Sequence, residues 1–334
     1  MKNVYIYPET DSGKRLNPYL DDLEAAIKTQ YNRVSSPSLL KGMQALLFAI
    51  PQTDVFLLNW IEDIPKRRFG LLQVPFVFLF VILCKVKGAK VVWTLHNKLS
   101  HKPSFWTVQI SRFLYKHADV LLTHAQEAFA WYELRFGHTT AQTHYRMHPT
   151  KAYPAIAHQE KTFDILIWGS VTAYKGVDDF LEFLKANALL TKYRIKVVGN
   201  FSSVPLHQKV MQYQSANIHI ENRSISFDEL NMLVAQSKIV LFTYRQNSVL
   251  SSGALMDSIS MNGSVLGPNI GAFKDLNEMG MVRTYHDFQH LRGLLDDILH
   301  NDWDNNIDSS RFIHENLWEN FSLWLNRVLE GNNE

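Results

Sequence analysis

Short apolar runs alternate along the chain with longer segments whose apolar residues recur at helical spacing. Polar turns bound each apolar run, which is the pattern of a buried strand. Buried strands separated by helices are typical of βαβ units that share one parallel sheet. The predicted strands cover 4–7, 55–59, 90–95, 120–123, 143–147, 163–168, 195–198, 218–221, 239–243 and 264–266.

The segments between these runs supply the predicted helices. Ser226 and Glu229 form a capping box at the start of one of them. A last helix is expected to carry apolar positions from Phe312 to Val328. The other predicted helices cover 18–29, 38–49, 69–87, 104–116, 125–136, 177–187, 206–214, 227–236 and 253–261.

Prolines and polar residues interrupt this alternation near the middle of the chain. Pro149, Pro154 and the polar stretch 158–162 indicate a linker near 150–161. We therefore predict an α/β fold with two Rossmann-like, doubly wound domains that face a cleft. The predicted domains cover 1–155 and 162–305, and a C-terminal helix follows within 306–334.

The composition describes a globular chain without a strong charge bias. Its 334 residues are 46% hydrophobic and 20% charged, which excludes a disordered protein. The net charge of +2 does not favour nucleic acid as a partner. The single cysteine, Cys84, lies in a very apolar run, so a buried inert thiol is expected rather than a nucleophile. No secretory signal precedes the first predicted strand, and we expect a cytoplasmic location.

The longest apolar run, 69–84, has two possible roles. It contains Gln73 and Pro75, and it is shorter than the roughly 20 apolar residues that a spanning helix needs. A core helix and a helix that lies on a membrane surface both fit this pattern. Basic residues on both sides favour contact between 66–87 and the inner face of a cytoplasmic membrane. These residues are Lys66, Arg67, Arg68, Lys85 and Lys87.

A small-residue turn follows the predicted strand 239–243. Ser251, Ser252 and Gly253 precede a helix, whose N-terminus offers unpaired N–H groups and a partial positive charge to an anion. Tyr244 and Arg245 end the strand before this turn. Arg245 fits either a phosphate ligand or a structural pair with an acid such as Asp275.

Two further strand ends carry candidate ligand-binding residues. Gly169 and Lys175 lie in WGSVTAYKG, which follows one strand and opens a helix, so the lysine fits a phosphate contact or an exposed cation. His96 and Asn97 end another strand in VVWTLHN. Their position fits the ligand crevice of an open sheet, although a structural histidine is the simpler alternative.

Nothing in the sequence predicts a metal site or a nucleophilic triad. The run Asp302–Trp303–Asp304 fits a solvated turn between helices, and the histidines show no zinc-type spacing. Ser251–Ser252–Gly253 lacks the flanking Gly-x-Ser-x-Gly of a nucleophile elbow. We expect no metal and no cofactor.

Six motifs, taken in order, resemble the retaining GT-B glycosyltransferases of family 4, in a bacterial subgroup that assembles surface polysaccharides. Asn59 stands where that subgroup usually has a histidine. The motifs are Asn17–Pro18–Tyr19, 55–63 (VFLLNWIED), 91–97 (VVWTLHN), 147–154 (MHPTKAYP), 168–176 (WGSVTAYKG) and 243–263 (TYRQNSVLSSGALMDSISMNG).

This resemblance implies a hexosyltransferase-type enzyme that moves a sugar from a UDP- or GDP-sugar to a glycan or polyprenyl-linked acceptor. It implies retention without a metal, an acceptor-binding N-terminal domain, a donor-binding C-terminal domain, and a last helix that packs back toward the first domain. His96 and Lys175 would be catalytic, since His96 would reach the donor sugar and Lys175 its diphosphate. The implied donor-binding residues are Gly169, Ser170, Lys175, Tyr244, Arg245, Ser251, Ser252, Gly253, Ala254, Asp257 and Ser258, and those on the acceptor side are Asn17, Asn97 and His148.

The sequence departs from the family pattern at two places. Ser170 and Thr172 occupy the loop where many members carry an arginine, so Arg245 would supply the second cation. Leu250 and Ser258 fall where glutamates are common, so the ribose would be held by Ser258 or Asp257. These departures keep two alternatives open. One is a non-catalytic nucleotide-sugar-binding or partner subunit, and the other is an epimerase or hydrolase of the same fold.

Overall fold

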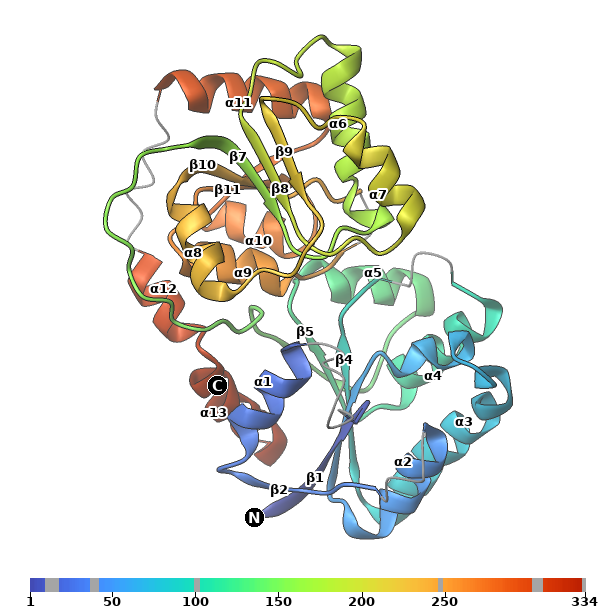
Figure 1. Ribbon diagram of the computed structural model, residues 1–334. Coiled ribbons are helices and arrows are strands. Elements are labelled where there is room, and N and C mark those ends of the chain that lie inside the picture. Colours follow the sequence, from blue (N-terminus) through green and yellow to red (C-terminus); the bar gives the residue numbers. More distant parts are fainter. Residues whose placement is uncertain (10–17, 37–41, 99–102, 246–248, 302–308, 332–334) are drawn as a thin grey trace. The chain divides into compact units, whose positions relative to one another are not determined.

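The computed structural model describes residues 1–9, 18–36, 42–98, 103–245, 249–301 and 309–331 (Figure 1). These residues form two compact units. The first unit contains Met1–Met147 and Trp318–Glu334, and the second contains His148–Leu317. The observed boundary follows Met147, so the expected linker at 150–161 belongs to the second unit, where Tyr153 hydrogen-bonds to Asp257.

The first unit is built on a six-stranded parallel sheet with the order β2-β1-β3-β4-β5-β6. Because all strands run the same way, their carboxyl ends meet at one edge of the sheet. The strands are β1 (Lys2–Tyr7), β2 (Tyr31–Arg33), β3 (Val55–Asn59), β4 (Lys90–Leu95), β5 (Val120–Thr123) and β6 (Gln142–Tyr145).

Helices pack on this sheet according to the alternation of its side chains. Val4 and Ile6 face the core formed with α1 and α13, whereas Tyr5 contacts Phe56, whose ring meets Phe80 of α3 at 4.8 Å. The labels in Figure 1 locate these helices. They are α1 (Pro18–Ile27), α2 (Met43–Ala49), α3 (Gly70–Lys87), α4 (Phe105–His117), α5 (Glu127–Phe136) and α13 (Trp318–Glu330), with short 3-10 helices η1 (Ile50–Gln52) and η2 (Ile61–Lys66).

The second unit is also a six-stranded parallel sheet, with the order β12-β11-β10-β7-β8-β9. The chain starts in the middle at β7, continues to one edge, and returns to β10 on the other side of β7. The order therefore reverses between β7 and β10. The strands are β7 (Phe163–Trp168), β8 (Ile195–Val198), β9 (Ile218–Glu221), β10 (Ser237–Leu241), β11 (Val265–Pro268) and β12 (Arg283–Tyr285).

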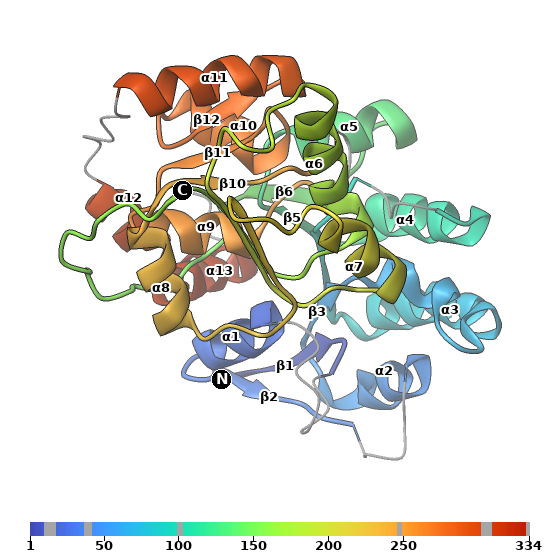
Figure 2. The same ribbon diagram turned by 45° about the horizontal axis from the view of Figure 1, so that its top comes forward.

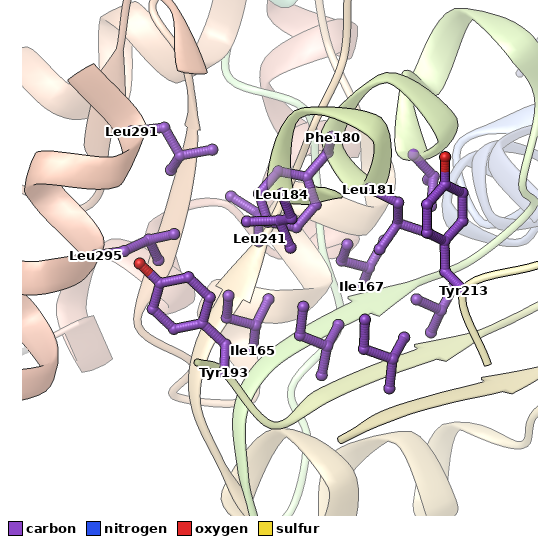
Figure 3. Packing of buried hydrophobic residues seen from close by; sticks show 14 of the residues in the cluster. Ile165, Ile167, Phe180, Leu181, Leu184, Tyr193, Tyr213, Leu241, Leu291 and Leu295 are labelled. Carbon is purple, nitrogen blue, oxygen red and sulfur yellow. The ribbon is translucent and has the colours of Figure 1, made fainter. Parts of the chain in front are cut away.

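Helices cover both faces of this sheet, as the turned view in Figure 2 makes visible. One apolar core joins Ile165 and Ile167 of β7 to Phe180 of α6 and to Leu291 and Leu295 of α11 (Figure 3). The helices are η3 (Ala173–Lys175), α6 (Val177–Ala186), α7 (Val204–Met211), α8 (Phe227–Ala235), α9 (Gly253–Ser260), α10 (Gly271–Glu278), α11 (Phe288–Asn301) and α12 (Ser309–Glu315).

The prediction of an α/β fold with two doubly wound parallel sheets is confirmed. Two strands were not predicted, β2 and β12, and both are short edge strands with polar sequences. The single last helix predicted from Phe312 to Val328 is wrong. The segment forms two helices: α12 ends before Asn316 and belongs to the second unit, whereas α13 begins after Leu317 and belongs to the first unit.

Candidate functional site

The candidate site in the second unit lies where the strand order reverses. In an open parallel sheet, the loops that follow the two strands on either side of such a reversal diverge and leave room for a ligand. Here these are the loop after β7, which contains Gly169 to Gly176, and the segment after β10, which leads to α9. The predicted residues of WGSVTAYKG and of the Ser–Ser–Gly turn therefore belong to adjacent strand ends.

The loop after β7 requires glycine at both of its ends. Gly169 has a φ of +94°, and a Cβ on the neighbouring Gly199 would lie 1.9 Å from the carbonyl oxygen of Gly169. Gly176 has a φ of +65°, and its Cβ would lie 2.5 Å from the oxygen of Thr243. The backbone thus turns sharply out of β7 and returns against the end of β10 before α6 begins.

Hydrogen bonds join this loop to the end of β10. The hydroxyl of Thr243 donates to the carbonyl oxygen of Lys175 at 2.6 Å, and the backbone N–H of Arg245 donates to the oxygen of Tyr174 at 3.0 Å. The two loops therefore form one continuous backbone surface around Lys175.

The ammonium group of Lys175 is held above an aromatic ring. Its Nζ lies 5.5 Å from the ring centroid of Tyr244 and 3.3 Å from the position of a Cβ on Gly169. Burial lowers the pKa of Lys175 below its usual value. A partly desolvated cation of this kind gains more from an anionic ligand than a fully hydrated one does.

Tyr244 connects Lys175 to the N-terminus of α9. Its hydroxyl lies 3.1 Å from Oγ of Ser252, which is the N-cap residue of that helix. Among the residues that the structure describes, no hydrogen bond involves the backbone N–H groups of Gly253 or Ala254. These groups and the helix dipole make the start of α9 suitable for an anion.

His148 lies against the same helix start. A Cβ on Gly253 would be 3.2 Å from Cε1 of His148, whose Nδ1–H donates to the oxygen of Pro149 at 2.7 Å. Burial lowers the pKa of His148 to about 4, so the ring is neutral at physiological pH. His148 was predicted on the acceptor side, and in the structure it is the first residue of the second unit.

Arg245 is engaged by the acidic first turn of α6. Its Nε and Nη2 donate to the two carboxylate oxygens of Asp179 at 2.7 and 3.0 Å, and Asp178 lies 3.7 Å away. Arg245 therefore forms a structural ion pair, as one of the two predicted alternatives required. Its partner is Asp179 on α6 rather than Asp275, the acid named from the sequence. A phosphate contact by Arg245 would have to compete with this bidentate pair.

Two other predicted donor residues are engaged by hydrogen bonds within the second unit. Ser258 is fully buried, donates to the oxygen of Ala254 at 2.8 Å and accepts from Nε1 of Trp168 at 2.9 Å. This burial argues against the predicted ribose contact by Ser258. Asp257 accepts a hydrogen bond from the hydroxyl of Tyr153 at 3.0 Å and is thus tied to the segment that precedes β7.

The remaining predicted donor residues flank the two loops. Ser170 is exposed and follows Gly169 at the end of β7, and Ser251 is half-buried just before the N-cap of α9. The structure therefore brings together Gly169, Lys175, Tyr244, Ser252 and the start of α9. Arg245, Asp257 and Ser258 are occupied by other parts of the second unit.

In the first unit, His96 sits in an aromatic cage at the carboxyl end of β4. Its ring stacks on Trp60 with centroids 4.1 Å apart and meets Tyr19 edge-on at 4.9 Å. Its Nε2 lies 2.8 Å from Oδ1 of Asn59, and Nδ2 of Asn59 donates to the oxygen of Tyr7. Because that donation fixes the amide orientation, Nε2 of His96 must carry the proton.

These partners of His96 were missed by sequence reasoning, although one signal was available. Asn59 ends the buried strand β3 and Trp60 follows it, and the carboxyl end of this strand shares the sheet edge with His96. The contact joins the ends of two strands that are 37 residues apart in the sequence, so local sequence did not reveal it. Tyr19 belongs to the motif Asn17–Pro18–Tyr19, but its contact with His96 was not predicted; its hydroxyl also lies 3.1 Å from Nε2 of His124.

The helix η2, which follows Trp60 in the chain, carries a buried carboxyl group. Glu62 of η2 is 5% exposed and accepts a hydrogen bond from Nε1 of Trp93 at 3.1 Å. Burial, and to a lesser degree the nearby Asp63, raise the pKa of Glu62 to about 7. On the same side, the half-buried Asn97 accepts a hydrogen bond at its backbone oxygen from Tyr132 at 2.9 Å. Asn17 lies outside the described residues.

Within the described ranges, no group of three or more His, Cys, Asp or Glu residues is placed to hold a metal ion. The Asp302–Trp303–Asp304 turn lies outside these ranges. Cys84 is buried and its thiol pKa is raised to about 12 by burial, which fits the predicted inert thiol.

Comparisons with known proteins identify the fold. No protein-family profile matches the chain, and no curated protein matches it. Among solved structures, HepE of Anabaena in complex with UDP has a TM-score of 0.68 at 13% identity, covering 99% of this chain and 100% of that one. A glycosyltransferase from Rickettsia africae ESF-5 has a TM-score of 0.63 at 12% identity, covering 98% and 97%.

A mutant of S. aureus TarM, in complex with fondaparinux, α-GlcNAc-glycerol and UDP, is also similar. Its TM-score is 0.61 at 13% identity, and the similarity covers 85% of this chain and 58% of that one. These structural neighbours are glycosyltransferases with the GT-B fold. The similarities therefore confirm the predicted GT-B fold for this chain.

Proposed function

We propose that this GT-B chain is a glycosyltransferase that moves a sugar from a nucleoside-diphosphate sugar to a glycan or lipid-linked acceptor. The observation that carries the proposal is the arrangement at the strand-order reversal of the second sheet. There Lys175, held above Tyr244, and the N-terminus of α9 lie at adjacent strand ends.

This arrangement suits a diphosphate leaving group. Negative charge grows on the departing nucleoside diphosphate as the glycosidic bond breaks, and a fixed cation with backbone N–H groups stabilises that charge selectively. Lys175 would contact the diphosphate from the loop after β7, while Gly253 and Ala254 would donate from the helix start. Charge from these groups supports a mechanism without a bound metal, and retention at the transferred sugar is proposed from the resemblance to the retaining family alone.

We assign the sugar-facing role in the first unit to His96. Its ring is fixed by Trp60 and Tyr19, and its Nε2–H is held by Asn59. A ring held so rigidly at the carboxyl end of a strand is well suited to orient a substrate hydroxyl.

The nucleotide is proposed to be UDP or GDP, and the UDP seen in complex with HepE and TarM supports the first of these. Calorimetric titration of the chain with UDP, GDP, ADP and CMP tests the base. Release of nucleotide from a panel of UDP- and GDP-sugars, with glycan and polyprenyl-linked acceptors, tests the reaction. Binding of none of these nucleotides would refute the proposal.

A second candidate is a non-catalytic subunit that binds a nucleotide sugar. The observation that favours it is the occupation of Arg245 by Asp179 and the burial of Ser258, which leave fewer groups for the donor. This candidate predicts nucleotide-sugar binding with no release of nucleotide under any acceptor. An epimerase or hydrolase of the same fold would instead consume the donor without an acceptor.

A further inference from the structure

The helix α3 presents one apolar face to the core and a second apolar face to the outside. Val77, Phe80, Val81 and Cys84 on the inner side are completely buried. The outer side, called here the outer face of α3, consists of Leu71, Leu72, Phe76, Leu79, Ile82, Leu83 and Val86. Leu72 is 72% exposed and Val86 is 82% exposed, so this face is bare along the whole helix.

Seven large apolar side chains on one helix face exceed the scattered apolar residues of an ordinary protein surface. The helix is long and apolar enough to cross a membrane by length and composition alone. It cannot do so here while its inner face packs in the core, where Phe80 contacts Phe56 of β3. A helix with one buried and one bare apolar face lies on a membrane rather than through it.

Basic residues lie at both ends of the outer face. The guanidinium of Arg68 stacks on the exposed Phe69 at 5.0 Å, and that of Arg67 lies 5.4 Å from the ring of Tyr7. Lys85, near the other end, lies 4.0 Å from Asp119 and is exposed. Tyr7 is buried, so only Arg68 and Phe69 form an exposed pair, and an arginine beside an exposed aromatic ring suits the boundary between lipid tails and anionic headgroups.

We propose that the outer face of α3 docks the first unit on an anionic lipid bilayer. The apolar side chains would enter the headgroup–acyl boundary, while Arg67, Arg68 and Lys85 would contact lipid phosphates. This inference stands on the exposed face and does not depend on glycosyl transfer.

The placement of α3 links this docking to the candidate site. The end of β3 contributes Trp60 to the His96 cage, and only the short helix η2 separates that end from Phe69 and the start of α3. The N-terminal end of the outer face therefore lies at the sheet edge that carries His96. A lipid-linked substrate would reach this edge without leaving the bilayer surface.

Vesicle flotation of the whole chain tests the proposal. The probes are vesicles of phosphatidylcholine with and without phosphatidylglycerol, and the variant is the double substitution Leu72→Glu with Leu79→Glu. Loss of two bulky apolar contacts should weaken binding to anionic vesicles by about tenfold or more. The matched control is Leu134→Glu on α5 with Leu323→Glu on α13, since these residues of the same unit are 90% and 55% exposed. This control should bind like the wild type.

A charge variant separates the two contributions. Arg67→Gln with Arg68→Gln should weaken binding by about fivefold per arginine and should remove most of the salt dependence. Equal binding of the wild type and the Leu72→Glu, Leu79→Glu variant would overturn the proposal. Absence of wild-type binding to anionic vesicles would also overturn it. A third contradicting outcome is a wild-type dimer in sedimentation that the Leu72→Glu, Leu79→Glu variant dissociates, since the face would then be a protein interface. Circular dichroism spectra and thermal unfolding like those of the wild type show that the variants are folded, and neither measurement depends on the proposed reaction.

Discussion

Replacement of Lys175 by methionine should change nucleotide binding and apo stability in opposite directions. Methionine keeps an unbranched stem that can pack over the ring of Tyr244, but it removes the charge that lies 5.5 Å from the ring centroid. The perturbation is therefore almost purely electrostatic.

The expected loss of affinity follows from the setting of the ammonium group. A phosphate charge about 4 Å from Nζ interacts by about 4 kcal/mol at an effective dielectric constant of about 20. Displacement of water from both groups reduces the net value to about 1.5–3 kcal/mol for a hydrogen bond to a charged group. We expect UDP or GDP to bind about 10- to 100-fold more weakly.

The expected effect on stability has the other sign. Burial lowers the pKa of Lys175 in the folded chain. Between the folded and the higher unfolded pKa, the unfolded chain binds more protons, so apo stability rises with pH in this alkaline range. At neutral pH the folded chain holds a desolvated cation at a cost. Methionine removes this desolvation cost, which stabilises the folded chain. It also removes a cation–π interaction with Tyr244, which opposes the gain by about 0.5–1 kcal/mol.

Calorimetry with UDP and GDP, together with thermal unfolding between pH 7 and pH 10, measures both effects. The Lys175→Met variant should show weaker binding, an apo Tm no lower than that of the wild type, and a flatter rise of Tm with pH. Lys185→Met, on the exposed last turn of α6, is the matched control and should change neither property. Unchanged affinity in Lys175→Met, or a fall in Tm like that of a core substitution, would refute the reasoning.

Three other variants test the neighbouring features. Asn59→Ala removes the acceptor that holds Nε2–H of His96 and should lower turnover about tenfold or more with unchanged nucleotide affinity; turnover equal to wild type would contradict the cage. Gly253→Ala should weaken nucleotide binding about tenfold, because its Cβ would lie 3.2 Å from Cε1 of His148, and added His148→Ala should restore part of the loss in calorimetry. Absence of any restoration would mean that the methyl group blocks the ligand itself. The folded-state pKa of Glu62 is raised to about 7, so the folded chain binds more protons than the unfolded chain above pH 4.5, and stability falls as pH rises through 7. Glu62→Gln keeps an acceptor for Trp93 and should raise Tm at pH 8 but not at pH 4, and an equal shift at both values would argue against the titration.

The central strands and the loops that follow them could be predicted because burial leaves a strong apolar signal. β7 and β10 lie in the middle of the sheet and are apolar, so the positions of Lys175 and Ser252 after them followed directly. β2 and β12 lie at sheet edges and read Tyr-Asn-Arg and Arg-Thr-Tyr. Edge strands bury fewer side chains, and their sequences therefore carry little of this signal.

The partners of the site residues could not be predicted, because they come from packing between distant segments. The capping box at α8 illustrates the difference within one motif. Ser226 caps the helix by accepting from the N–H of Glu229 at 3.2 Å, as the local sequence indicates. The carboxylate of Glu229 binds Arg223 instead of closing the box. Arg245 with Asp179, and His96 with Asn59 and Trp60, are the same kind of tertiary outcome.

The helix α13 imposes an order on the folding of the chain. Its residues Phe321, Trp324, Leu325 and Leu329 complete the core of the first unit against α1 and β1, yet the whole second unit precedes them in the sequence. During synthesis, the second unit can fold before α13 is made. Until then, the face of the first sheet that packs against α13 remains exposed. The segment made first is therefore the last to be finished, and during that interval its apolar face is open to chaperones or to aggregation.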